Sequence, residues 1–221
     1  MPGAVRIGRL LGVDLFVHNS WLIVAVILLL LRENVYSNQL WNALEYVSLF
    51  GIVLLHEFGH ALACRSVGGR ADRILLWPLG GVAFVQPPPR PGAYLWSIAA
   101  GPLVNVGLIP VTLGVLIGAR ALFPDLSKDA DGFLFAMAFI NILLLVFNML
   151  PIYPLDGGQI VRGLLWLVVG PIRSLGIAAT IGLIGALGAL VLAALARDVW
   201  LVIMALFAAS RSWAGLQAAR L

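Results

Sequence analysis

The chain has 221 residues, of which 62% are hydrophobic and only 11% are charged, and its mean hydropathy is +1.02. This composition excludes an average soluble domain and indicates an integral membrane protein embedded in a lipid bilayer. A chain of this length forms one domain or at most two, and we expect residues 1–221 to form a single membrane core domain without an appended soluble domain.

Apolar runs along the chain predict about six membrane spans. A spanning helix needs about 20 apolar residues, and before the first run residues 6–18, "RIGRLLGVDLFVH", look strand-like. The first run is short and is expected to be tilted or only partly embedded. The predicted spans are residues 18–31, 44–64, 95–118, 132–150, 174–196 and 199–215.

Residues 68–92 form the one long interruption between these spans. The stretch reads "GGRADRILLWPLGGVAFVQPPPRPG", and its prolines and glycines exclude a spanning helix. Short β-rich runs at 74–77 and 82–85 predict a hairpin or a loop that lies at the inner face or dips into the membrane. The predicted fold is therefore an all-α polytopic membrane protein with a small membrane-associated β-region at the cytoplasmic side.

The distribution of basic residues indicates the topology. If the N-terminus is cytoplasmic, four basic residues lie outside, and these are Arg32, Lys128, Arg120 and Arg197. Ten lie inside: Arg6, Arg9, Arg65, Arg70, Arg73, Arg90, Arg162, Arg173, Arg211 and Arg220. This asymmetry follows the positive-inside rule. The net charge of +4 therefore reflects topology, and we expect no nucleic-acid partner.

The stretch "LLHEFGHALA", residues 54–63, places three ionisable groups inside a predicted span. His56 and His60 are four residues apart and so share one face of a helix, a spacing that suits one Zn²⁺. Glu57 can act as general base without ligating the metal. Ionisable residues within a span are costly and indicate a functional site. The spacing predicts a metal site inside the bilayer, about 7–13 Å below the cytoplasmic interface.

The third metal ligand is expected on the cytoplasmic side as well. Glu33 and Glu45 precede the motif and fall on the outer side, whereas Asp156 lies in "FNMLPIYPLDGGQI", residues 147–160, where prolines and glycines break the helix. Asp156 could also cap a helix that starts at Gly157. His18 competes with Asp156 by residue type, but it stands at the start of the first span, and we predict Asp156 as the ligand.

The sequence resembles the site-2 protease family of intramembrane zinc metalloproteases. The resemblance rests on the HExxH motif, on "GPLVN" at residues 101–105 and on "NxxPxxPLDGG" at residues 148–158, in this order and across nearly the whole chain. It implies one Zn²⁺ per chain held by His56, His60 and Asp156, with Glu57 as the catalytic base. Many members carry an acidic residue before the Gly-Pro pair that begins "GPLVN". The corresponding stretch here reads "PRPGAYLWSIAAGP" and contains no acidic residue.

Two asparagines beside the predicted site have alternative roles. The amide of Asn105 or Asn148 within a span could bond a neighbouring helix, or it could contact the substrate or an oxyanion. The resemblance favours substrate positioning for Asn148. For Asn105 both roles remain open.

We expect an enzyme, a zinc metalloendopeptidase that hydrolyses peptide bonds of membrane-spanning substrates such as single-span proteins. The alternatives are a membrane metal-ion transporter and a non-catalytic homologue that binds membrane proteins. A transporter would spread its ligands along a path, and a non-catalytic homologue would not need Glu57. Thirteen arginines against one lysine, with abundant alanine and glycine, favour a prokaryote, and we expect its inner membrane. The distribution of basic residues places the N-terminus and the opening of the active site on the cytoplasmic side.

Overall fold

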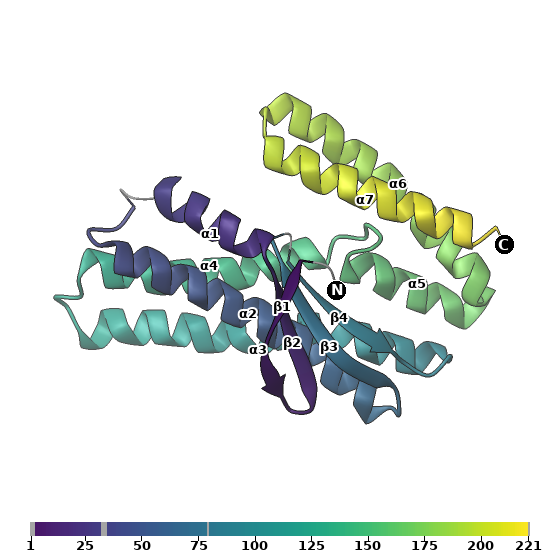
Figure 1. The fold of residues 1–221 in the computed structure, drawn as a ribbon, viewed down its shortest axis with the longest axis horizontal. Helices are drawn as coiled ribbons and strands as arrows, with labels where there is room; N and C mark the ends of the chain where they lie inside the picture. The colour runs from purple at the N-terminus through teal and green to yellow at the C-terminus, as the bar shows by residue number, and fades with distance from the viewer. Residues whose placement is uncertain (1–2, 32–34, 79, 221) are drawn as a thin grey trace. The chain divides into compact units, whose positions relative to one another are not determined.

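In the computed structural model, which describes residues 3–31, 35–78 and 80–220, the chain divides into two compact units. The first unit contains residues 1–86 and 100–145, and the second contains residues 87–99 and 146–221. Figure 1 labels the elements of both. They follow in the order β1 (Ala4–Leu10), β2 (Val13–His18), α1 (Ser20–Leu31), α2 (Gln39–Ser66), β3 (Arg70–Trp77), β4 (Gly80–Gln86), α3 (Pro91–Leu122), α4 (Lys128–Asn148), α5 (Asp156–Val169), α6 (Pro171–Ala196) and α7 (Val199–Ala218).

Five of the helices in the described ranges are long and apolar enough to cross a membrane: α2, α3, α4, α6 and α7. They coincide with the second to sixth predicted spans. The first predicted span, residues 18–31, contains α1, which has only 12 residues and is too short to be counted with these five. At ~1.5 Å per residue it covers about 18 Å of a hydrocarbon core of about 30 Å. Arg32 and Glu33, which the sequence places on the outer side, lie outside the described residues.

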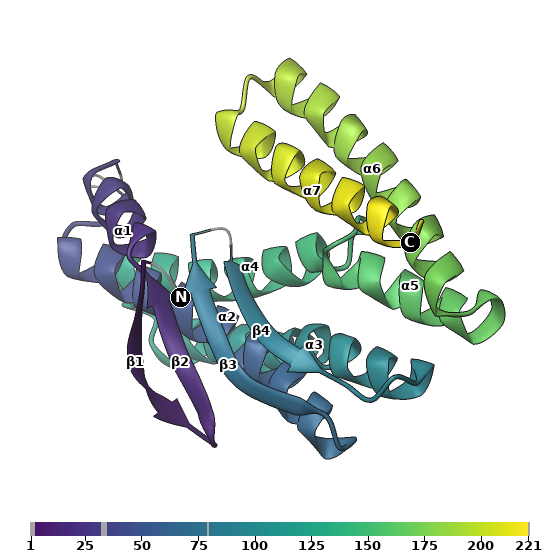
Figure 2. The ribbon, with the colours of Figure 1, turned by 45° about the vertical axis from the view of Figure 1, so that its right-hand side comes forward.

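A four-stranded sheet is the centre of the first unit, with its strands in the order β1, β2, β3, β4 (Figure 2). The predicted hairpin is confirmed as β3 and β4, which pair antiparallel. The strand-like N-terminal segment forms a second hairpin, and its strand β2 pairs parallel to β3. One face of the sheet packs against α2 through a buried cluster that includes Val13, Ile74, Leu76, Phe58 and Ala61.

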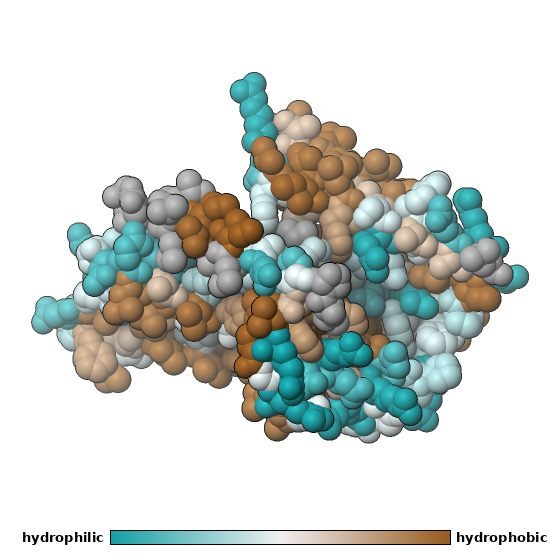
Figure 3. Space-filling view, in the orientation of Figure 1, coloured by the Kyte–Doolittle hydropathy of each residue, from teal (hydrophilic) through white to brown (hydrophobic). Residues whose placement is uncertain are grey.

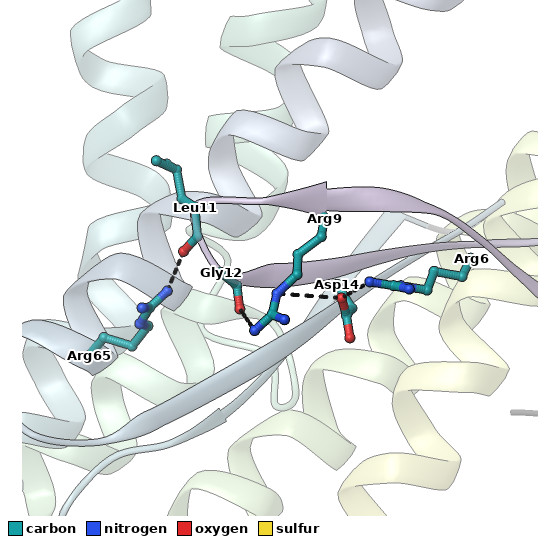
Figure 4. Close-up of polar contacts among 6 residues, drawn as sticks. All are labelled: Arg6, Arg9, Leu11, Gly12, Asp14 and Arg65. Carbon is teal, nitrogen blue, oxygen red and sulfur yellow. Dashed lines mark hydrogen bonds and ion pairs between the residues drawn. The ribbon is translucent and has the colours of Figure 1, made fainter.

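The turn of the N-terminal hairpin is fixed to the end of α2. Leu11 and Gly12 both have positive φ angles, 51° and 79°, as the two central residues of a type I′ turn require. The Arg65 side chain donates to the Leu11 carbonyl at 2.5 Å, and Arg9 donates to the Gly12 carbonyl at 3.4 Å (Figure 4). The hairpin turn therefore packs at the C-terminal end of α2, the helix that carries the HExxH motif.

Helices α2 and α3 approach closely within the first unit because Gly59 lies at their contact. A Cβ added at Gly59 would stand 2.6 Å from the carbonyl oxygen of Ala100. Small residues allow this kind of close backbone approach between membrane helices. The contact brings the "GPLVN" segment of α3 to the face of α2 that carries the histidines.

The second unit is built on an antiparallel pair of helices, α6 and α7, joined by a tight turn. Arg197 ends α6 in the left-handed conformation, and the Asp198 carboxylate caps α7 by accepting from the backbone N–H groups of Trp200 and Leu201. Apolar side chains dominate the visible surface of this pair (Figure 3). Leu195, for example, is 78% exposed. Such exposure is expected where lipid surrounds a helix.

The helix α5 is not one of the predicted spans, although the alternative role considered for Asp156 supposed a helix starting at Gly157. It has 14 residues and begins directly at Asp156, after the irregular segment 149–155. Ser212 of α7 donates to the Tyr153 carbonyl at 2.6 Å, which ties this segment to the second unit. Gly157 and Gly158 are required here, because a Cβ at either position would collide with the backbone of residues 149–153.

Candidate metal centre

His56 and His60 lie on one face of α2, as their spacing predicts. Both side chains are buried, and their Nε2 atoms are 3.1 Å apart. Two nitrogens bound to one tetrahedral Zn²⁺ at about 2.0–2.1 Å would be about 3.3 Å apart. The pair therefore has a spacing that suits one shared zinc ion.

Gly101 of α3 packs directly against this pair of imidazoles. A Cβ at position 101 would collide with His60 and would lie 2.8 Å from the Nε2 atom of His56. Only glycine leaves the space between α3 and the two histidines open. The first residue of the "GPLVN" segment thus shapes the metal centre by the absence of a side chain.

Replacement of Gly101 by alanine is expected to weaken metal binding by about 10–100-fold, the range seen when the support of a metal ligand is lost. The added methyl group would occupy the place where the Nε2 atoms meet. Titration of the purified variant against a zinc chelator measures the effect. Gly107→Ala in the same helix is the control, because a Cβ there meets no atom within 4 Å. Equal zinc affinity in both variants would contradict this account.

Glu57 is held from the sheet side. It is buried, and its Oε2 atom accepts a hydrogen bond of 2.7 Å from the backbone N–H of Ala83 in β4. Gly81 of the same strand makes room for it, since a Cβ there would stand 2.6 Å from Oε1 of Glu57. The strand thus fixes the carboxylate that follows His56 in sequence, which sequence reasoning did not predict.

The side chain of Asn105 contacts His56, one of the two histidines of the motif. Its Oδ1 atom lies 2.5 Å from Nδ1 of His56, and the residue is fully buried within the first unit. The side chain thus makes a contact between helices, one of the two roles that the sequence left open, and the contact with substrate or an oxyanion stays a prediction. The partner is a predicted metal ligand, so this contact also belongs to the centre.

Two predicted site residues lie in the second unit. Asn148 ends α4, and Asp156 begins α5 with a buried side chain. The N-cap position of α5 is Leu155, without a side-chain cap hydrogen bond. Asp156 therefore does not occupy the capping position that the sequence offered as its alternative role.

The remaining histidine, His18, is engaged locally at the end of β2. Its Nδ1 atom lies 2.6 Å from the Ser20 hydroxyl and 3.3 Å from the Ser20 backbone nitrogen, which donates to it. These contacts join the sheet to the start of α1. They give His18 a structural role in the first unit.

The sequence profile of peptidase family M50 matches residues 45–123 and 118–192. A zinc metalloprotease of Methanocaldococcus jannaschii is 30% identical over 207 residues, which cover 94% of this chain and 59% of that relative. Stage IV sporulation protein FB of Bacillus subtilis is 33% identical over 111 residues, 49% of this chain and 36% of the relative. The chain thus spans 59% or less of the length of these relatives.

A solved structure shows a similar fold. The site-2 protease from Methanocaldococcus jannaschii aligns with a TM-score of 0.73 and 29% sequence identity. The alignment covers 96% of this chain and 95% of that one. The likeness therefore includes the helices and the small sheet together.

Proposed function

We propose that this chain, which belongs to peptidase family M50, is an intramembrane zinc metalloprotease that hydrolyses peptide bonds of membrane-spanning proteins. The observation that carries the proposal is the buried pair His56 and His60, with converging Nε2 atoms, next to a glutamate that the sheet holds in place. Such an arrangement inside an apolar helix is costly unless it serves a site. The alternatives of a transporter or a non-catalytic homologue have no comparable support.

One Zn²⁺ per chain would be held by His56, His60 and Asp156. The neutral imidazole and carboxylate donors are ligands that zinc prefers, and three protein ligands leave the fourth position that a catalytic site needs. The bound ion would supply a Lewis acid that acidifies the attacking water and polarises the scissile carbonyl. The zinc metalloprotease among the relatives supports this choice of metal.

Glu57 moves the protons in this scheme. Its carboxylate takes a proton from the attacking water and later delivers it to the leaving peptide nitrogen. The hydrogen bond from Ala83 N–H keeps Oε2 in a fixed direction during both transfers. We assign Asn148 to substrate positioning, which the family resemblance supports.

The substrate must be extended at the site, because a helix hides its carbonyl groups in internal hydrogen bonds. Strand β4 stands at an edge of the sheet and is suited to pair with an extended segment. One of its N–H groups, that of Ala83, already serves Glu57. A substrate strand would therefore pair beside the catalytic base.

Purified protein in detergent is expected to cleave single-span membrane proteins, and a zinc chelator is expected to abolish the cleavage. Restoring Zn²⁺ should restore activity, since the metal supplies the Lewis acid that the reaction needs. Fragments are resolved by gel electrophoresis and located by mass spectrometry. Cleavage that persists at full rate in chelator would contradict the proposed chemistry.

We further propose a prokaryotic inner membrane, with the N-terminus and the site opening cytoplasmic and α1 contributing a sixth, partial crossing. The asymmetry of arginine residues supports this orientation. Cysteines introduced at positions 70 and 128, after replacement of Cys64, should then be labelled from opposite faces of sealed cells. Labelling of both from one face would refute the orientation.

A further inference from the structure

Behind His56, two buried amides form a chain of hydrogen bonds that links α2, α3 and α4 within the first unit. Asn105 Nδ2 donates to Asn141 Oδ1 at 2.8 Å, and Asn141 Nδ2 donates to the backbone carbonyl of Asn105 at 3.0 Å. Both asparagines are 0% exposed. The chain ends at the imidazole Nδ1 of His56, 2.5 Å from Asn105 Oδ1.

The direction of every hydrogen bond in this chain follows from one group. The backbone carbonyl of Asn105 can only accept, so the NH₂ group of Asn141 must face it and the Asn141 oxygen must face the Asn105 side chain. Asn105 then presents its NH₂ group to Asn141 and its oxygen to His56. Because that oxygen only accepts, the hydrogen of a neutral His56 ring is on Nδ1.

This tautomer has a direct consequence for the metal centre. With the hydrogen on Nδ1, the lone pair of His56 is on Nε2, the atom that lies 3.1 Å from Nε2 of His60. A metal-bound histidine needs this arrangement, and partners on its other nitrogen fix both the tautomer and the ring orientation. Asn105 supplies the contact, but the orientation of its amide depends on Asn141.

We propose that Asn141 is a positioning residue, which sets the tautomer and the orientation of His56 through Asn105. The inference rests on the proposed function, since it concerns a zinc ligand. A contact that only joined α3 to α4 would fix the same amide orientations but would end at the two asparagines. Here the orientation of both amides is fixed and leads to the ligating imidazole.

Replacement of Asn141 by leucine should weaken zinc affinity by about 10–100-fold, the range for loss of such support. Chelator competition gives the affinity, thermal unfolding reports the integrity of the fold, and the absorption spectrum of the Co²⁺-substituted protein reports ligand geometry. The matched control is Thr112→Val, which also removes a polar group from the first unit. Among the described residues, the Thr112 hydroxyl bonds the Leu108 and Ile109 carbonyls of its own helix, so zinc affinity and spectrum should stay unchanged.

A double-mutant cycle separates positioning from packing. If Asn141 acts through Asn105, the single variant Asn105→Ala should already show the loss of zinc affinity. Adding Asn141→Leu to it should then weaken zinc binding no further. Additive losses in zinc affinity would overturn the inference, as would wild-type affinity in Asn141→Leu. Should that variant not fold, Asn141→Ser replaces it in the same cycle. Zinc binding by the unmodified chain is measured first, because its absence would instead refute the proposed function.

Discussion

Replacing Glu57 by glutamine is expected to abolish peptide cleavage while about one zinc ion per chain remains bound. Glutamine has nearly the same shape, and its carbonyl oxygen can still accept the hydrogen bond from Ala83 N–H. It cannot take a proton from water, so the general-base contribution of about 10²–10⁴-fold is lost. The metal should stay, because the ligands on α2 are untouched.

Zinc content by elemental analysis and cleavage of a membrane substrate are measured on the same preparation. Glu45→Gln is the matched control, since Glu45 is also buried in α2 and accepts a hydrogen bond of 2.5 Å from the Tyr36 hydroxyl. It precedes the motif by more than two helical turns, so cleavage should be retained there. Normal cleavage by Glu57→Gln would refute the protease assignment.

The long helices could be predicted because the hydropathy of each run of residues, taken by itself, indicates a membrane-spanning helix. Each of α2, α3, α4, α6 and α7 is an apolar run of at least 20 residues, and lipid imposes this length directly. Helix α5 is not among the predicted spans because it is shorter and carries Asp156, Gln159 and Arg162 among apolar residues, and the sequence indicated only a helix start near Gly157. The parallel pairing of β2 with β3 was also out of reach, since it joins segments separated by two helices.

The site shows the same division between local and distant information. The spacing of the HExxH motif fixes its residues on one helix face, so His56, Glu57 and His60 could be assigned from sequence. Which residues of other elements meet that face depends on packing, and Gly101, Gly81 and Asn141 were missed. One signal was available for Asn141, the single polar residue between Gly132 and Asn148 in an apolar helix.

The third ligand is the prediction on which the proposed metal centre depends most. Asp156 is buried at the first residue of α5, and a buried carboxylate needs a compensating partner such as a cation. His18 is only partly buried, and its Nδ1 atom is engaged by Ser20 at the start of α1. The two residues therefore differ in what their loss should do.

Asp156→Ala is expected to strip or greatly weaken zinc and to abolish cleavage, whereas His18→Ala should keep the metal and at most slow turnover. Asp198→Ala is the matched control in the second unit. It removes the cap of α7, at a cost of about 1 kcal/mol of stability, and should leave zinc in place. Zinc content of the three purified variants decides the assignment. Metal retained without Asp156 but lost without His18 would move the third ligand to the histidine, because only a ligand's removal should release the ion from an otherwise folded site.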